Sequence, residues 1–289
     1  MRKFEILFDQ VEPSQIEHRA YIPYGSLGFP PAHPHRPWIF ANFVQSIDGI
    51  ASFKGKHAAG GDISRSPEDG WLMQLLRAHA GALIMGVGTL LEETRTMPQL
   101  NEGRGSLYRV EDAELCELRQ KLGLGREKII FVTASAWIDP SLFRVFDGDL
   151  VDAFILTGSQ GAERLAGKQV NVLIAADGSG GVDLEKGMRM IRSQLNVEHL
   201  LCEGGPTLYG NMSRRGLIDE KFLTVSPVEI GLVIPPEQEP AQSELSHPPR
   251  QRPTTFMAPG FTAENAPWWR WVSSRRVGDH EFNRYRRTS

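Results

Sequence analysis

Two glycine-rich turns are the part of this sequence best suited to hold a charged ligand. One reads Gly-Val-Gly-Thr at 86–89, and the other reads Cys-Glu-Gly-Gly-Pro-Thr at 202–207. Each follows an apolar run and opens into a helical pattern, where free backbone N–H groups and the helix dipole attract phosphate. One such turn alone is usually only a tight connection, but two together predict a nucleotide site. The glycines concerned are Gly86, Gly88, Gly204 and Gly205.

Three charged side chains fall where they could act on a substrate. Asp48 follows an apolar run, Glu203 directly precedes two glycines, and Arg77 lies beside the apolar stripe of a predicted helix. A carboxylate at a strand end can act as an acid, a base or a hydrogen-bond acceptor. Asp48 could equally be a turn residue that binds backbone N–H groups, and Arg77 could simply cover apolar surface with its stem.

Several other kinds of site lack their signatures. No GxxxxGK[ST] motif occurs and GVGTLL does not match GxGxxG, which disfavours the common phosphate loops. The two cysteines, Cys116 and Cys202, have no CxxC partner, the eight histidines show no HExxH spacing, and no serine lies in a GxSxG elbow. We therefore expect no metal, and hydrolysis and acyl transfer rank low.

Short apolar runs that alternate with amphipathic helices would position these residues. A helix begins at Pro67 behind the capping residue Ser66, and a hairpin is expected around Gly278-Asp279. The pattern predicts an α/β fold with a mostly parallel sheet flanked by helices and finished by antiparallel C-terminal strands. Its ligand would lie at the carboxyl ends of the strands. The apolar runs expected as strands are WIFANFVQ, ALIM, KIIFVT, DAFILT, NVLIAA and VEHLLC.

Length and composition fit one globular domain. The 289 residues are 40% hydrophobic and 23% charged, with a net charge of −3, which gives no reason to expect nucleic acid or an anionic membrane. No signal peptide or membrane span is apparent, so we expect a cytoplasmic protein. Prolines between Gly25 and Pro37 predict an irregular, extended arm over 1–37, followed by a single domain over 38–289 with a long loop at 231–266.

Taken together, these residues resemble the pyrimidine reductases of riboflavin biosynthesis, which share the dihydrofolate reductase-like fold. The matching segments occur in the family's order and span about residues 38–232. The deaminase half of bifunctional members, with its zinc-binding pattern, has no counterpart here. The segments are NFVQSIDGIAS at 42–52, LLRAHAGALIMGVGTLLEE at 75–93, VDLEKGMRMI at 182–191 and LLCEGGPTLYGNMSRRGLIDEKFLTVSPVEIG at 200–231.

The resemblance implies an NADPH-dependent reduction of the ribosyl group of 5-amino-6-(5-phosphoribosylamino)uracil by a homodimer. The cofactor would carry the hydride, and the protein would position the reactants. Asp48 would assist the ring-opened sugar, and Arg77 and Glu203 would face the substrate. The Gly204–Gly205 peptide would be cis. The residues implied at the cofactor are Ile63, Thr89, Thr133 or Ser135, Gly205, Pro206, Thr207 and Leu208.

Departures from the family pattern leave the substrate open. Many relatives have Asp-Asp-Pro-x-Leu-Thr-x-Arg where this chain has EETRTMPQLNEGR at 92–104. There we expect Glu93 at the cofactor and Leu100 and Arg104 at the substrate, together with Asn42, which stands where some relatives have lysine. The alternatives are reduction of another heterocycle or carbonyl compound, such as a pterin, and a non-enzymatic nucleotide-binding protein. The candidates for binding the 2′-phosphate of NADPH are Arg65, Arg95 and Arg164.

Overall fold

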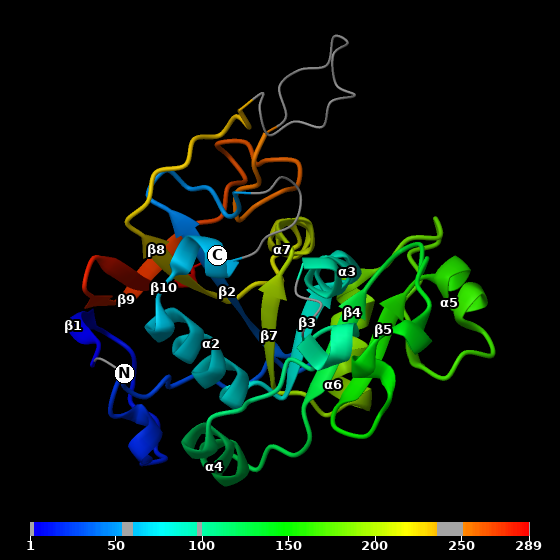
Figure 1. The fold of residues 1–289 in the computed structure, drawn as a ribbon, viewed down its shortest axis with the longest axis horizontal. Coiled ribbons are helices and arrows are strands. Elements are labelled where there is room, and N and C mark those ends of the chain that lie inside the picture. Colours follow the sequence, from blue (N-terminus) through cyan, green and yellow to red (C-terminus); the bar gives the residue numbers. More distant parts are fainter. Residues whose placement is uncertain (1–2, 54–59, 97–99, 236–250, 289) are drawn as a thin grey trace.

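A ten-stranded sheet forms the centre of the molecule (Figure 1). The computed structural model describes residues 3–53, 60–96, 100–235 and 251–288. The strand order is β1-β9-β10-β8-β2-β7-β3-β4-β5-β6. The strands are β1 (Glu5–Asp9), β2 (Trp38–Ser46), β3 (Ala82–Gly86), β4 (Lys128–Val132), β5 (Asp152–Thr157), β6 (Asn171–Ile174), β7 (His199–Gly204), β8 (Glu220–Ser226), β9 (Trp269–Val277) and β10 (His280–Arg287).

The pairing of the strands confirms the predicted sheet. From β8 through β2, β7, β3, β4 and β5 to β6 every pair is parallel. The pairs β8–β10, β10–β9 and β9–β1 are antiparallel. The predicted hairpin is β9 and β10, which turn at Gly278 with a left-handed φ of 57°.

Helices cover both faces of the sheet, as a parallel sheet requires. Leucines of α2 and α4 pack in one core with Phe40 and Phe131, whereas α6 and α7 pack in a second core with Ile39 and Ile84. Neighbouring strand residues thus point to opposite faces. The helices are η1 (Arg19–Tyr21), α1 (Gly60–Ser64), α2 (Pro67–His79), α3 (Val87–Thr96), η2 (Leu100–Gly103), α4 (Ala113–Lys121), η3 (Pro140–Leu142), η4 (Arg144–Phe146), α5 (Ser159–Leu165), α6 (Leu184–Gln194) and α7 (Pro206–Arg214).

Local signals place α2 where the sequence predicted it. Ser66 has an extended backbone, and its hydroxyl accepts a hydrogen bond from the Asp69 N–H, while Pro67 occupies the first turn. Such a cap satisfies one of the free N–H groups at the start of a helix. The helix therefore begins at a fixed residue and holds Arg77 in its last turn, toward the interior.

The N-terminal segment differs from the expected irregular arm. Glu5–Asp9 forms β1 and pairs with β9, and Arg275 Nη2 donates to Asp9 Oδ2 at 2.5 Å. Phe4 and Tyr24 are buried and meet edge to face, with ring centroids 5.0 Å apart. The sequence did not predict β1 because its partner strand lies more than 260 residues away, so the local pattern carries no sign of the pairing.

The loop expected at 231–266 is described only in part. The described parts of the loop at 231–266 contain isolated bridges, such as Ile50 with Thr254, and no regular strand or helix, as expected. Residues 236–250 lie outside the described residues.

No helix in the described ranges is long and apolar enough to cross a membrane. Those ranges also hold no group of three or more His, Cys, Asp or Glu that could bind a metal.

Candidate active site

Two helices begin side by side at the carboxyl ends of neighbouring strands. Gly204 ends β7 and Pro206 opens α7, while Gly86 ends β3 and Val87 opens α3 directly. Strands β7 and β3 are parallel neighbours, so both helix N-termini lie at the same end of the sheet (Figure 1). The dipoles of α3 and α7 therefore present positive ends to the same space, as phosphate binding requires.

We call Thr89, Gly204, Gly205 and Pro206 the glycine cradle. Gly204 has a φ of +131°, which disfavours any residue with a side chain. A Cβ added at Gly204 or Gly205 would lie 4.0 or 3.8 Å from Thr89 Oγ1, so the missing side chains leave main chain open beside this hydroxyl. No side chain among the described residues caps α7. These groups fit a phosphate-bearing cofactor.

The peptide bond between Gly204 and Gly205 corrects one expectation. The described residues contain no cis peptide bond, so this bond is trans rather than cis as the resemblance implied. The left-handed φ of Gly204 provides the change of direction from strand to helix without it. The cradle does not depend on the isomer, because access to its main chain follows from the missing Cβ atoms.

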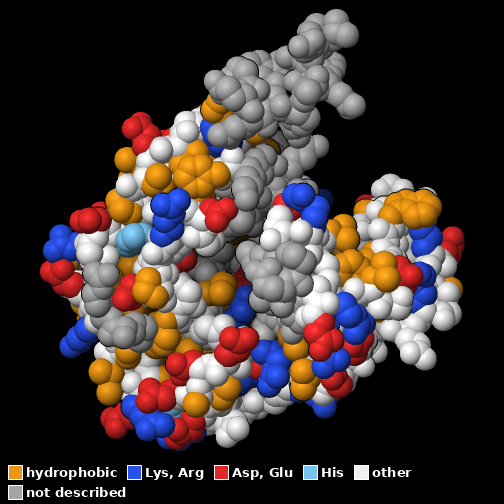
Figure 2. All heavy atoms as spheres, in the orientation of Figure 1, with side chains coloured by type: hydrophobic (Ala, Val, Ile, Leu, Met, Phe, Trp, Pro, Cys, Tyr) orange, Lys and Arg blue, Asp and Glu red, His pale blue; other side chains and the backbone are white. Residues whose placement is uncertain are grey.

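A cavity of about 500 Å³ opens beside the glycine cradle, and we call it the central cavity. Its walls come from β2, α2, α3 and β7, and Figure 2 shows the surface hollowed near the middle of this face. The structure thus brings together residues from distant segments of the sequence, with α1 and the segment at 106–108 completing the walls. The predicted site residues in its walls are Asn42, Arg77, Thr89, Glu93, Glu203, Gly204, Gly205 and Pro206.

An ion pair between Arg77 and Glu203 lies in the wall of the central cavity. Arg77 Nε and Nη2 donate to the two carboxylate oxygens of Glu203, each at 2.7 Å, and the side chains are 10% and 8% exposed. Burial alone would lower the pKa of Arg77, but the charge and hydrogen bonds of Glu203 raise it. This fork holds a permanent cation and a carboxylate at fixed positions beside the cavity.

A second carboxyl group, Glu93, faces the same cavity. Burial raises its pKa, and the negative charge of Glu203 adds to that effect, while the neighbouring Tyr108 hydroxyl and the charge of Arg77 oppose it. The pKa of Tyr108 is also raised, first by burial and then by Glu93. Glu203 and Glu93, two of the carboxyl groups in the cavity walls, therefore have different electrostatic settings, one paired with arginine and one beside a phenol.

Asn42 contributes an unsatisfied polar group. Its Oδ1 is buried and has no hydrogen-bond partner among the described residues, although the residue lines the central cavity from β2. Buried polar atoms are almost always paired in folded proteins. An unpaired amide at the cavity wall is suited to bind a polar group of a ligand.

Asp48 lies outside the walls of the central cavity. Its carboxylate accepts hydrogen bonds from Ser46 Oγ at 2.5 Å and from the Gly231 N–H at 2.6 Å. Its slight burial would raise its pKa, but these hydrogen bonds lower it. In this structure Asp48 fixes the turn after β2 to the segment after β8, which is the turn role that its position also suggested.

The other predicted residues are not in the walls of the central cavity. Arg104 pairs with Asp147 at 2.8 Å, and Leu100 belongs to η2, but its side chain lies outside what the structure describes. Thr133 accepts a bond from the Ala136 N–H. Ile63 is buried in α1 and Leu208 is buried in α7. Gly86 and Gly88 flank the start of α3, Thr207 is exposed in the first turn of α7, and Ser135 is exposed after β4.

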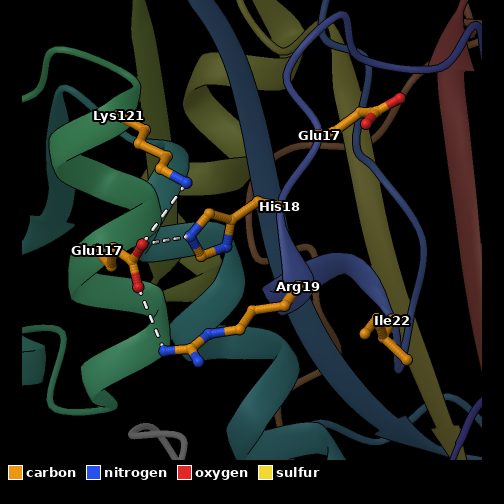
Figure 3. Close-up of a pocket in the computed structure, with 6 residues that line it drawn as sticks. All are labelled: Glu17, His18, Arg19, Ile22, Glu117 and Lys121. Carbon is orange, nitrogen blue, oxygen red and sulfur yellow. Dashed lines mark hydrogen bonds and ion pairs between the residues drawn. The ribbon is translucent and has the colours of Figure 1, made fainter.

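A hollow between η1 and α4 is a weaker candidate for a site (Figure 3). Glu117 lies 3.3 Å from Arg19, 3.5 Å from Lys121 and 3.6 Å from His18. Glu17 also lines the hollow, so two carboxylates balance Arg19 and Lys121, and little net charge remains to bind a ligand. The hollow also lies far from the helix starts at the strand ends, as Figure 3 and Figure 1 show by its position beside α4.

Tyr108 is the main cavity residue that the sequence did not reveal. It lies between η2 and α4 with a positive φ of 54°, and its ring lies 5.8 Å from the Arg77 guanidinium. A single tyrosine in a segment without periodicity carries no signal. Strained backbone at a cavity wall is common in functional sites, but it is visible only in a structure.

A family model and curated proteins both match this chain. The model of the RibD C-terminal domain matches residues 37–254. The 2,5-diamino-6-ribosylamino-4(3H)-pyrimidinone 5′-phosphate reductase of Archaeoglobus fulgidus is 27% identical over 196 residues, covering 68% of this chain and 83% of the relative.

Solved structures share the fold. A pyrimidine reductase-like protein from Corynebacterium diphtheriae has a TM-score of 0.64 at 21% identity, covering 94% of this chain and 100% of that chain. RibD of Acinetobacter baumannii has a TM-score of 0.61 at 16% identity over 88% of this chain, which spans 59% of that protein.

Proposed function

Because this chain belongs to the RibD C-terminal domain family, we propose that it reduces a ribosylaminopyrimidine 5′-phosphate of riboflavin biosynthesis with NADPH. The observation that carries the proposal is the position of the Arg77–Glu203 pair beside the glycine cradle, in one cavity. The cradle is suited to a nucleotide, and the charged pair is suited to a polar, anionic substrate. A reductase needs both ligands next to each other.

The glycine cradle would hold the cofactor. Its open main chain and the starts of α3 and α7 would bind phosphate, and the Thr89 hydroxyl would add a donor. When bound, NADPH supplies the hydride. The protein would hold cofactor and substrate next to each other, and the cavity walls would exclude water from them.

The cavity walls would bind the substrate. Arg77 has N–H groups beyond the two that bind Glu203, and Glu203 has free lone pairs that could accept from sugar hydroxyls. The unpaired Asn42 Oδ1 would accept a hydrogen bond from the pyrimidine ring or its amino groups. These contacts would recognise the substrate without a metal ligand set.

Asp48 remains our proposed catalytic carboxylate on the strength of the family likeness. It lies two residues beyond the end of β2, the strand that carries Asn42. To reach a sugar it must exchange its bond with the Gly231 N–H for one with substrate. Glu93, which already faces the cavity, would help to position the cofactor or the substrate.

One observation favours a different substrate on the same site. Arg104, expected to bind the substrate phosphate, is paired with Asp147 instead. We therefore keep reduction of another heterocycle, such as a pterin, as the second candidate. By family likeness we also propose a cytoplasmic homodimer, which sedimentation of the purified protein would test for its oligomeric part.

The test is a reduction assay with purified protein. NADPH or NADH is mixed with the deaminated or the undeaminated pyrimidine phosphate, and loss of the reduced nicotinamide absorbance is followed. Turnover of either pyrimidine supports the proposal. Cofactor binding without turnover of either favours the second candidate or a non-enzymatic role, which a pterin assay distinguishes. Failure to bind either nicotinamide nucleotide refutes the proposal.

A further inference from the structure

We infer that Trp137 and Arg164 form a subsite for the adenosine 2′-phosphate of the cofactor, and this inference rests on the proposed function. Trp137 is 76% exposed, and the Arg164 guanidinium lies 4.6 Å from the centroid of its indole ring. Arg164 Nη1 donates to the Ser135 carbonyl at 2.5 Å, which holds the guanidinium over the ring. A flat aromatic surface and a fixed cation thus stand together at the protein surface.

Both residues are placed by the elements that follow neighbouring strands. Trp137 lies in the loop after β4, and Arg164 lies in α5 after β5. Gly161 brings α5 close to this loop, because a Cβ there would lie 2.0 Å from Thr157 Oγ1 and 3.1 Å from the Ala136 Cβ. The pair is therefore built by tight packing of helix against loop, although its two side chains are exposed.

The strand order of the sheet places this pair where the adenosine end of a bound dinucleotide would lie. Across the sheet the strands follow the order β2-β7-β3-β4-β5. The central cavity lies toward β2, the glycine cradle spans β7 and β3, and Trp137 and Arg164 lie beyond the ends of β4 and β5. All these strands are parallel, so every feature lies at the same end of the sheet. At about 4.8 Å per strand, β5 lies about 14 Å from β7. A nicotinamide in the cavity would leave the adenosine to extend toward the pair.

The chemistry of the pair suits a phosphorylated adenosine. Nucleobases stack on aromatic side chains, and a guanidinium binds phosphate through paired N–H groups. No carboxylate in the described part of the chain forms an ion pair with Arg164, so its remaining N–H groups face solvent. Figure 2 shows hydrophobic side chains beside Lys and Arg side chains on the part of the surface around α5.

The other two candidate arginines are less suitable. Arg95 binds the carboxylate of Glu92 at 2.5 Å on the exposed face of α3. Arg65 lines the central cavity, on the side where the nicotinamide and the substrate would lie. Only Arg164 combines the expected side of the sheet with a stacking surface.

The test measures binding of 2′,5′-ADP and 5′-ADP by calorimetry to the wild type and three variants. Arg164→Ala should weaken 2′,5′-ADP about tenfold or more, the loss of a charge-assisted contact, and leave 5′-ADP within about twofold. Trp137→Ala should weaken both about tenfold, because stacking does not depend on the 2′-phosphate. Arg95→Ala, the matched control, should change neither. Circular dichroism checks that each variant is folded.

The outcomes separate this inference from the proposed function. If the wild type binds NADPH but Arg164→Ala keeps the same preference for 2′,5′-ADP over 5′-ADP, the inference is wrong and the proposed function stands. If Arg95→Ala removes that preference instead, the subsite lies at α3 and the inference is wrong. If the wild type binds neither NADPH nor NADH, the proposed function fails together with it.

Discussion

Replacing Glu203 by leucine would leave the Arg77 guanidinium without its carboxylate inside the protein. The two side chains are only 10% and 8% exposed, and two bonds of 2.7 Å join them. Removing one partner of a buried pair costs about 3–5 kcal/mol, because the remaining charge has lost its compensation. We expect the free energy of unfolding to fall by about 3 kcal/mol in Glu203→Leu, the lower end of this range, because the pair borders a cavity that admits water.

Replacing both partners separates stability from function. Two well-packed apolar residues often substitute for a buried ion pair at little cost, so Arg77→Met combined with Glu203→Leu should recover to within about 1 kcal/mol of the wild type. Urea unfolding of the wild type, the two single variants and the double variant gives the coupling energy. Under the proposed function the double variant folds but loses activity about 100-fold or more, since charge-assisted substrate contacts are gone.

An exposed pair provides the matched control. Arg276 and Glu5 are joined at 2.8 Å but are 51% and 57% exposed, so Glu5→Leu should cost less than about 1 kcal/mol. If Glu203→Leu costs no more than this control, the cavity pair is solvated and the electrostatic reasoning is wrong. If the double variant keeps full activity, Arg77 and Glu203 do not bind substrate.

Three further changes test other parts of the structure. In Asp48→Asn we expect kcat to fall about 100-fold with a KM within a few-fold if the carboxylate is catalytic, whereas a lower Tm with unchanged kcat would leave it only a turn role. Gly204→Ala puts a side chain at φ +131° beside Thr89 and should weaken NADPH binding about tenfold, while Gly125→Ala, whose Cβ meets open space, should not. Burial lowers the pKa of His79 to about 4 from 6.5, so the unfolded chain takes up a proton between these values that the folded chain does not. The free energy of unfolding should therefore fall by up to about 3 kcal/mol as the pH drops from 6.5 to 4. The urea midpoints at pH 7 and pH 4.5 should differ less in His79→Gln than in the wild type. An equal pH dependence in the variant would contradict the assignment of this effect to His79.

The parts of the fold that local chemistry determines were predictable from the sequence. A cap at Ser66, a proline at the first turn and a leucine stripe specify α2 within a few residues, and each apolar run gave a strand of the parallel sheet. The glycine-rich turn between β7 and α7 was predictable for the same reason, and Gly204 adopts a backbone conformation that only glycine tolerates easily. These features depend on neighbours in sequence.

The parts that depend on distant partners were not predictable. Arg104 was assigned to substrate, but its partner Asp147 lies 43 residues away and only the folded chain brings them together. Tyr108 enters the cavity through a positive φ that its sequence does not suggest. Glu203 was predicted at a strand end and lines the central cavity, yet its pairing with Arg77 appears only when β7 and α2 meet.

The pairing of β1 with β9 has a consequence for how the chain reaches its folded state. Bonds from Asp9 to Arg275 and from Glu5 to Arg276 join residues 266 and 271 positions apart. Contacts so distant in sequence form late, because a long loop must close first. During synthesis Phe4 therefore lacks its contact with Phe282 until β10 has emerged. The apolar residues around β1 are thus exposed to aggregation while the residues between β1 and β9 are being synthesised.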